Sequence, residues 1–324
     1  MTDTGTPPLP RAALIVSVVA AVAYGVMIRI VIDKQVFADI LGVMSVAFIS
    51  VVPMVVGYLA VRPTPRPEWR FAIFFPWIPT LLIALITGVI GFEGAICIIM
   101  ALPILLVNAS IGGVVAMVVT RRQAARNAGV TAAVLVFPLL FGAVERGIPV
   151  VVQYRVVANS IDIQAAPGTV WREIVSVREI QPDEIPGKPL FLRMGFPRPL
   201  SAEIDRDAVG GARKARFAGG VLFLETVTDF AQDSLLSFSI RAQTDSIPPG
   251  TLDEHVTIGG PYFDVLRGTY RIERLGADSV RLHLESRLRV STHFNWYAGL
   301  WADAVMGSIQ RNILEVERAR AERR

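Results

Sequence analysis

The sequence predicts two domains of different kinds: a multi-pass α-helical membrane domain over residues 1–150 and an α+β domain over residues 154–324. Three observations support this division. Long apolar runs fill the first half, apolar residues then alternate with polar ones as they do in strands, and helical spacing returns near the C-terminus. The length of 324 residues suits two domains. The hydrophobic content of 52% and the mean hydropathy of +0.50 are high for a soluble protein.

Five apolar runs predict the transmembrane helices. A helix needs about 20 apolar residues to span the bilayer core. The first four runs reach that length, and the fifth reaches it only if it continues past Glu145 and Arg146. The predicted spans cover residues 12–32, 36–61, 71–91, 95–120 and 128–148.

The arginines between the runs predict the orientation of the chain. Arg62–Arg70 and Arg121–Arg126 each carry three arginines, whereas the link at residues 92–94 carries no basic residue. Loops rich in arginine stay in the cytoplasm. We therefore expect a cytoplasmic N-terminus and a C-terminal domain on the periplasmic or extracytoplasmic side of the cytoplasmic membrane, although Arg29 and Lys34 count against this orientation.

The first run has some features of a signal peptide. Arg11 precedes it, and Ala21–Ala23 resembles a cleavage site. The run continues through Ile32, which favours an uncleaved helix. Cleavage would leave four spans and the same placement of the C-terminal half.

Polar residues are few within the runs, and most can reach a helix end. The deep one is Asn108, which we interpret as a hydrogen bond between helices. The small residues of 108–116 favour close helix packing. The sequence shows no paired acids at mid-membrane and no convincing inverted repeat, so a transporter is poorly supported. The full set of polar candidates is Arg29, Asp39, Glu93, Asn108 and Glu145.

Charge and cysteine content exclude several classes of function. Residues 1–150 carry ten Lys or Arg and six Asp or Glu, and the rest of the chain is balanced at 22 of each. No basic stripe lies on a folded face, so we expect no nucleic-acid partner. Cys97 is the one cysteine, so the chain has no intrachain disulfide, and with only three histidines we expect no metal site and no cofactor.

In the second half, an opening strand at 156–165 leads into a helix that begins at Pro167, a residue suited to a first helical turn. A second short helix or turn covers 178–189. Four strands then follow in hairpins, with alternating residues pointing to opposite faces. They cover 200–207, 212–219, 221–230 and 235–242. We expect the arginines Arg213, Arg216 and Arg241 of these strands to face solvent, and likewise Arg267 of the strand that follows them.

Two more strands and a long helix complete the predicted domain. Residues 254–276 are long for one strand, and Gly259-Gly260-Pro261 indicates a bulge or bend. The strand at 277–290 alternates cleanly, which places His283 on a solvated face. The closing helix, with Ser291 or Thr292 as its cap, is expected to cover the sheet and to project into water from Glu315 onward. Its apolar stripe is Tyr297, Leu300, Trp301, Ala304, Val305, Ile309, Ile313 and Val316.

The element order and the residues Ala166, Pro167, Val170 and Trp171 resemble the START-like (SRPBCC) helix-grip superfamily. This superfamily includes polyketide cyclases, Bet v 1-type proteins and lipid-transfer domains. The resemblance covers about residues 156–317. It implies a curved antiparallel sheet with two short helices that grips the long C-terminal helix, with an apolar cavity between them. It transfers no catalytic residue, and the membrane half resembles no family that we can name.

Two groups of residues are candidates for a site. Tyr297 and Trp301, beside small residues of the last helix, are candidate ligand-binding residues, together with Tyr262 and Phe238. The alternative is that the two helical aromatics simply fill the core. His255, Tyr262 and Asp264 could supply acid–base chemistry, and the alternative is that they decorate a surface loop.

These features predict a membrane-anchored domain that binds a hydrophobic ligand, a lipid or isoprenoid-like molecule from the adjacent bilayer. Two other functions remain open. One is a cyclase- or hydrolase-like enzyme that acts on an apolar substrate. The other is a non-catalytic sensor or assembly module, and the sequence indicates no particular protein partner.

Overall fold

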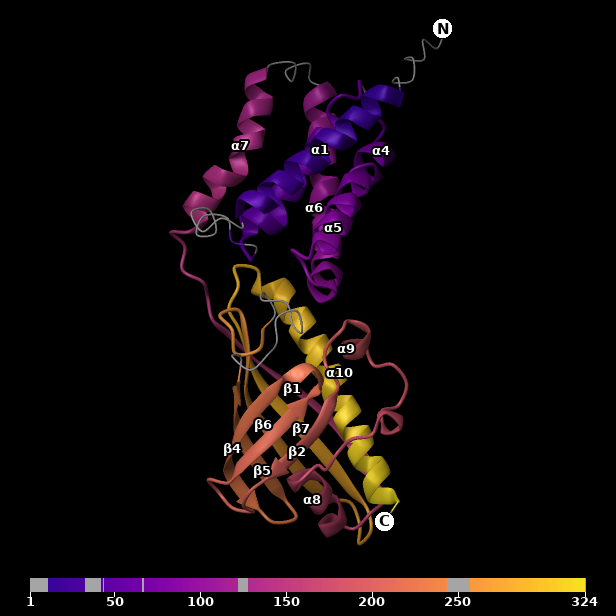
Figure 1. The fold of residues 1–324 in the computed structure, drawn as a ribbon, viewed down its shortest axis with the longest axis vertical. Coiled ribbons are helices and arrows are strands. Elements are labelled where there is room, and N and C mark those ends of the chain that lie inside the picture. The colour runs from indigo at the N-terminus through magenta and orange to yellow at the C-terminus, as the bar shows by residue number, and fades with distance from the viewer. Residues whose placement is uncertain are drawn as a thin grey trace. The chain divides into compact units, whose positions relative to one another are not determined.

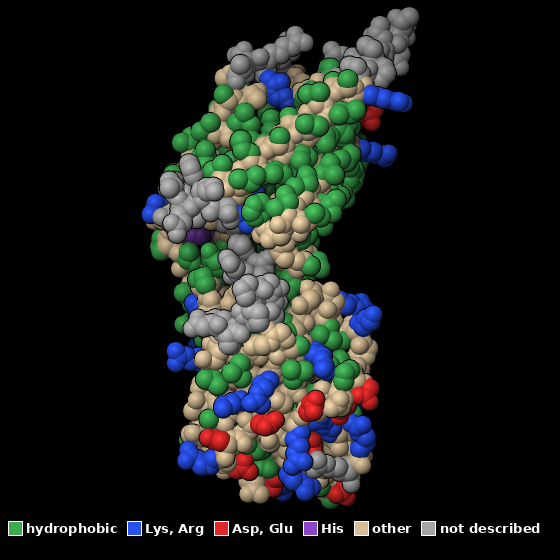
Figure 2. All heavy atoms as spheres, in the orientation of Figure 1, with side chains coloured by type: hydrophobic (Ala, Val, Ile, Leu, Met, Phe, Trp, Pro, Cys, Tyr) green, Lys and Arg blue, Asp and Glu red, His purple; other side chains and the backbone are tan. Residues whose placement is uncertain are grey.

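The computed structural model describes residues 11–32, 42, 44–65, 67–121, 128–243 and 257–323. The chain divides into two compact units, Met1–Pro149 and Val150–Arg324. Each is described by itself. Figure 2 shows that hydrophobic side chains cover most of the visible face of the first unit, whereas charged side chains are scattered over the second.

The first unit consists of helices (Figure 1). Three stretches are long and apolar enough to cross a membrane: Arg11–Val31, Trp69–Ile90 and Ala95–Arg121. Ala47–Val61 and Gly129–Glu145 are apolar but shorter. Part of the predicted second run and part of the Arg121–Arg126 loop lie outside the described residues. The elements are α1 (Arg11–Ile32), the π-helical segment η1 (Ala47–Val51), α3 (Val52–Val61), α4 (Trp69–Phe74), α5 (Trp77–Ile90), α6 (Ala95–Arg121) and α7 (Ala128–Glu145).

The polar residues of this unit bind one another or the backbone. Arg29 Nε donates to Glu93 Oε1 at 2.7 Å. The Glu145 carboxylate accepts the backbone N–H groups of Val46 and Ala47 at 2.7 and 2.9 Å, at the first turn of a helix, where such donors lack partners. Asn108 Nδ2 donates to Ser50 Oγ at 3.3 Å, which is the interhelical bond that we predicted. The candidate Asp39 lies outside the described residues.

Helices α3 and α6 approach each other closely through glycine. A Cβ atom added at Gly57 would lie 1.9 Å from the carbonyl oxygen of Ala109, and one at Gly112 would lie 1.8 Å from that of Met54. Real Cβ atoms do not approach so closely, so only glycine fits at both positions. The small residues of 108–116 therefore have the packing role predicted for them.

We expect Gly112→Ala to separate these two helices and to lower the stability of the helical unit by about 1–3 kcal/mol, the usual cost of overpacking. Thermal unfolding of the purified chain in detergent measures the effect. Gly129→Ala is the matched control, because a Cβ atom there meets nothing within 4 Å. Equal stability of the two variants would contradict the close approach.

The second unit is one seven-stranded antiparallel sheet with helices, in the predicted element order (Figure 1). The strands lie in the order β1-β7-β6-β5-β4-β3-β2. Helix α10 packs on β1 and β7 and also contacts α8 and α9. The bounds are β1 (Gln153–Ile163), α8 (Pro167–Val175), a 3-10 turn (Pro182–Glu184), α9 (Leu190–Arg193), β2 (Pro199–Ile204), β3 (Ala212–Phe217), β4 (Leu222–Ala231), β5 (Leu235–Ala242), β6 (Phe263–Arg274), β7 (Val280–Val290) and α10 (Asn295–Glu322).

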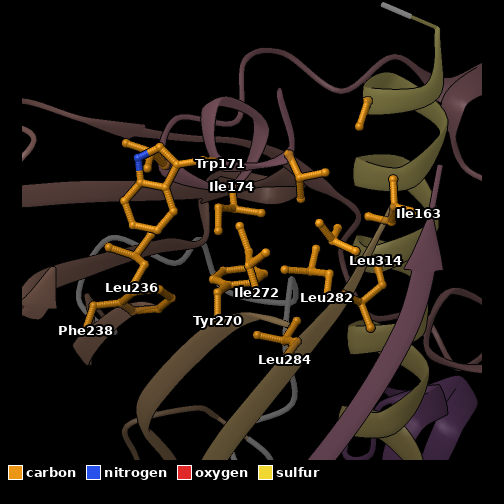
Figure 3. Close-up of a cluster of buried hydrophobic side chains, with 14 of the residues drawn as sticks. Ile163, Trp171, Ile174, Leu236, Phe238, Tyr270, Ile272, Leu282, Leu284 and Leu314 are labelled. Atoms are coloured by element: carbon orange, nitrogen blue, oxygen red, sulfur yellow. The ribbon is translucent and has the colours of Figure 1, made fainter. Parts of the chain in front are cut away.

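The core of this unit lies between the sheet, α8 and α10. Trp171 and Ile174 of α8 point onto the inward residues of β5 to β7, and Leu314 closes the cluster from α10 (Figure 3). The Trp171 ring meets Phe230 edge-on at 5.1 Å between centroids. Because β7 alternates, Val280, Leu282 and Leu284 enter this core on one face, and His283 lies on the other face with Glu273 at 2.9 Å.

The ends of α10 differ from the prediction. Its N-cap is Phe294, without a side-chain cap, because the Thr292 hydroxyl instead accepts the Phe294 N–H before the helix begins. Leu300 and Ala304 of the predicted stripe are exposed. The charged C-terminal turns do not project into water, since Val316, Glu317 and Ala321 are buried. The corresponding ionic contacts include Arg320 with Glu184 at 2.6 Å.

The predicted bend at Gly259-Gly260-Pro261 ends the strand. Gly259 adopts a φ of 81°, which favours glycine, and β6 begins only at Phe263. The bend is fixed by Arg289, which donates to Gly260 O at 2.6 Å, and by the Ser291 N–H, which donates to Tyr262 O at 2.9 Å. Residues 254–256 of the predicted strand lie outside the described residues.

Candidate functional site

A cavity of about 140 Å³ lies inside the second unit, between the inner face of the sheet and α10. A single water needs only about 10–15 Å³ by such a measure, so the cavity has room for a larger molecule. Its apolar wall comes from β2 to β7, from the segment between α8 and β2, and from α10. The apolar lining is Val177, Ile180, Phe196, Pro197, Pro199, Ala202, Ala215, Phe217, Val221, Phe223, Phe238, Ile240, Ile258, Val265, Gly268, Leu284, Met306, Ile309 and Ile313.

The lining side chains reach the cavity because of strand alternation. Arg213, Ala215 and Phe217 are inward residues of β3, and Phe223 and Glu225 are inward residues of β4. Small inward residues such as Ala215 leave space that larger side chains such as leucine would fill. The remaining, polar members of the lining are Ser201, Arg213, Glu225, Tyr270, Ser286 and Gln310.

A buried ion pair forms one polar part of the wall. Arg213 NH1 lies 2.5 Å from Glu225 Oε2, and both side chains are almost fully buried. Arg213 also donates to Ile174 O at 3.3 Å and lies over the Phe238 ring, 5.1 Å from its centroid. Burial lowers the pKa of Arg213, but attraction to Glu225 outweighs burial, so the guanidinium stays charged. Its Nε is buried without a hydrogen-bond partner among the described residues.

Tyr270 and Glu317 form a second polar pair behind the first. The Tyr270 hydroxyl donates to Glu317 Oε1 at 2.9 Å. Burial raises the pKa of Glu317 to about 8, so its carboxyl is mainly protonated at neutral pH. Burial and the nearby Glu317 also raise the pKa of Tyr270 well above its ordinary value. Tyr270 therefore serves as a hydrogen-bonding hydroxyl and not as a base.

Gln310 and Ser286 form the third polar part of the wall. Gln310 Nε2 donates to Ser286 Oγ at 2.8 Å and to Val157 O at 2.9 Å. Its Oε1 accepts from Asn159 Nδ2 at 2.7 Å. These bonds hold α10 on β1 and β7 and fix one polar edge of the cavity. The site is thus an apolar chamber with three fixed polar positions.

No family model and no curated protein matches this chain. Among solved structures it is similar to a START superfamily protein from Mycobacterium smegmatis, with 15% identity over 52% of this chain and 97% of that one and a TM-score of 0.34. It is also similar to the Zhui aromatase/cyclase from Streptomyces sp. R1128, with 14% identity over 53% of this chain and 96% of that one and a TM-score of 0.33. A third similar structure is a truncated norcoclaurine synthase from Thalictrum flavum, with 13% identity over 52% of this chain and 95% of that one and a TM-score of 0.30.

The topology decides the fold. One strand, two short helices, six more antiparallel strands and a long helix packed on the sheet are the arrangement implied by the resemblance. The C-terminal unit is a helix-grip domain. Its cavity lies where such an arrangement places one, between the sheet and the last helix.

The helix-grip domain places the predicted ligand-binding residues in different surroundings. Phe238 lines the cavity, and the close approach of Gly268 on the neighbouring strand makes room for its ring. Tyr297 and Trp301 are partly buried and do not line this cavity, because they lie more than one turn before Met306 on α10. Tyr262 does not line it either, since it belongs to the bend before β6.

Tyr262 and Asp264, the two predicted acid–base residues that the structure describes, do not line the cavity. His255 lies outside the described residues. Asp264 accepts the Val265 N–H at 2.8 Å and does not line the cavity, although burial raises the pKa of its carboxyl. The acid–base hypothesis therefore gains no support from the described part of this segment.

Arg213 corrects a prediction. It is buried rather than solvent-facing, whereas Arg216, Arg241 and Arg267 are exposed as expected. One signal in the sequence could have identified it. Arg213 shares the strand phase of Ala215 and Phe217, and Glu225 shares that of Phe223 and Val227 on the next strand. When a basic residue and an acidic residue both fall on the inward-facing positions of neighbouring strands, as Arg213 and Glu225 do, a buried ion pair is indicated.

Proposed function

We propose that this chain is a membrane-anchored START-like protein whose helix-grip domain binds a hydrophobic ligand on the outer side of the cytoplasmic membrane. The observation that carries the proposal is the apolar cavity with its few fixed polar groups, a combination typical of sites for hydrophobic ligands. The apolar helices of the first unit support membrane anchoring. The arginines between the apolar runs support the outward placement.

The cavity also indicates the kind of ligand. A cavity of about 150 Å³ takes a molecule the size of benzene. The cavity of about 140 Å³ therefore suits one ring or a short branched segment, as in an isoprenoid-like molecule, better than the two chains of a phospholipid. Glu225 already neutralises Arg213, and Glu317 is protonated near neutral pH. A ligand with an uncharged polar group, such as a hydroxyl or carbonyl, fits these surroundings better than an anion.

We expect Ala215→Phe to abolish ligand binding, because the added ring points into a cavity that has room for about one ring. Native mass spectrometry of the full chain, purified from membranes, measures the bound mass. Lys214→Phe is the matched control, because it adds the same ring one residue away on the outer face of β3. Bound ligand in Ala215→Phe, or an unliganded wild-type chain after exposure to membrane lipids, would contradict the proposal.

The orientation has its own test. A reporter enzyme that is active only in the cytoplasm, fused after Arg324, should remain inactive. A second reporter that is active only outside the cytoplasmic membrane should give signal at the same position. Cytoplasmic activity would overturn the outward placement without affecting the evidence for a ligand.

A further inference from the structure

The end of the helix-grip domain at which β1 begins carries an exposed group of apolar side chains. Trp296 is 69% exposed and Leu300 is 60% exposed, on the outward face of the first two turns of α10. Tyr154 and Val156 are exposed at the start of β1, on the face opposite to the one on which Arg155 meets α10, and the exposed Val151 and Val152 lead into that edge strand. We call these six residues the apolar rim.

The rim is held rigidly on the domain. Asn295 Nδ2 donates to Val151 O at 2.6 Å, and Asn295 Oδ1 accepts the Thr292 N–H at 2.7 Å. An ion pair joins Arg155 of β1 to Asp303 of α10. Gly299 leaves the space for that guanidinium, since a Cβ there would lie 2.8 Å from Arg155 NH1. These contacts tie the first turns of α10, which carry Trp296 and Leu300, to β1.

The opposite end of the sheet has a different surface. Its turns carry Asp205, Asp207, Asp233 and Asp278. The exposed apolar residues there, Val209 and Leu275, stand singly, which is ordinary for a protein surface. Among the described residues, several exposed apolar side chains that include a Trp and a Tyr lie at the end where β1 begins.

Chain length and residue chemistry identify what covers the rim. Residues 146–152 join the apolar helix α7 to β1, and such a segment reaches at most roughly 25 Å. If α7 ends at a membrane face, the start of β1 stays close to that face. Trp and Tyr prefer the membrane–water interface, where their rings are apolar and their polar atoms remain hydrated. Arg287, exposed on β7, lies over the Tyr154 ring at 4.8 Å and adds a cation suited to anionic headgroups.

We propose that the apolar rim is a lipid-facing surface that inserts into the headgroup region of the bilayer. The inference rests on the membrane anchoring in the proposed function. The cavity lining includes Ile258 and Val265, which lie toward this same end of the sheet. The rim would thus hold the cavity end of the helix-grip domain against the lipid surface from which a hydrophobic ligand comes.

Site-directed spin labelling of the full chain tests this proposal. Leu300→Cys in a Cys97→Ser background carries the label and keeps Trp296, in vesicles of phosphatidylcholine and phosphatidylglycerol. Ala319→Cys is the matched control, because it is exposed on the same helix near its other end. We expect the label at 300 to collide more often with lipid-soluble oxygen, and less often with a water-soluble nickel chelate, than the label at 319.

Three outcomes would contradict the proposal that the apolar rim faces lipid. A label at 300 that is as accessible to nickel as the one at 319 faces water. A label that neither reagent reaches is covered by protein, either another part of the chain or a second copy. Release of the chain from the vesicles in an alkaline wash would overturn membrane anchoring itself. It would therefore also overturn the proposal that the bilayer covers the apolar rim. Ligand binding is measured separately, so its failure is distinguishable from all three.

Discussion

Arg213→Met is expected to lower the free energy of unfolding of the helix-grip domain by about 3–5 kcal/mol, the usual cost of removing one partner of a buried ion pair. The Arg213 and Glu225 side chains are only 4% and 7% exposed. After the substitution, the Glu225 carboxylate would stay in an apolar interior without its cation. The charge must then be buried unpaired or neutralised by a proton, and both alternatives cost free energy.

Hydrogen exchange of the full chain in detergent measures this loss in the right place. Amides of β3 to β5 that exchange only by unfolding of the domain report its stability, whereas a single unfolding curve of a chain with two units does not define one free energy. The variant should exchange much faster at these amides. Unchanged protection would show that Glu225 finds another partner or is hydrated.

Two control variants separate the charge effect from the loss of packing. The double variant Arg213→Met, Glu225→Leu removes both charges and is expected to recover most of the loss, since apolar replacements of buried pairs are often neutral or stabilising. Arg216→Met removes an exposed arginine that lies 3.9 Å from an exposed Glu203. Its expected effect is below about 1 kcal/mol.

The order of strands and helices in the second half was predictable because a half-buried sheet leaves a strong pattern. In β7, for example, the inward residues Val280 to Val290 alternate strictly with polar ones that face outward. Alternation fixes the phase of each strand, and Pro167 marks the start of α8. This local information is sufficient for the element order, and the structure confirms it.

The polar wall of the cavity was harder to predict, because the sequence of one strand does not show what its neighbours supply. Arg213 was interpreted as solvated since arginine rarely lies inside a protein unless it is paired. Its partner Glu225 comes from the next strand, and Glu317 comes from the far end of the chain. Only the register of the sheet and the position of α10 bring them together.

The closing helix shows the same limit. Charged residues after Glu315 predicted a solvated end, and aromatic residues near Tyr297 predicted a buried start. In the structure the Glu317 side chain enters the domain and Leu300 of the predicted stripe is exposed, whereas Tyr297 and Trp301 are partly buried. Periodicity establishes a helix, but it did not show which charged residue would find a partner such as Tyr270 inside the fold.

Glu317→Gln is expected to make the helix-grip domain more stable than the wild type by about 3 kcal/mol at pH 7, because each unit of pKa shift corresponds to about 1.4 kcal/mol. The ordinary pKa of the glutamate carboxyl is 4.5, and burial raises that of Glu317 to about 8. Between these values the folded state holds a proton that the unfolded state releases. The contribution of the protonated carboxyl is therefore complete below pH 4.5 and is lost as pH rises toward 8.

Glutamine keeps the shape of the protonated carboxyl and can still accept the Tyr270 hydrogen bond, but it does not titrate. Between pH 4.5 and 8 the wild type should thus lose more stability than the variant, because burial also raises the pKa values of Asp264 and Glu225, which titrate in both proteins. The other groups that face Glu317 are Arg213, Glu173 and Arg320, from β3, α8 and α10. Among groups with a depressed pKa, Glu184 titrates near 2 in the folded state, below the window of interest.

Hydrogen exchange at several pH values, corrected for the intrinsic rate, checks this difference. Glu315→Gln is the control on the same helix, because its side chain is 37% exposed and pairs with Arg318 one turn away. A parallel decline of wild type and Glu317→Gln between pH 4.5 and 8 would show that Glu317 is ionised in the folded domain. The polar wall behind the cavity would then carry a negative charge at neutral pH, and an uncharged ligand group would no longer be the best fit.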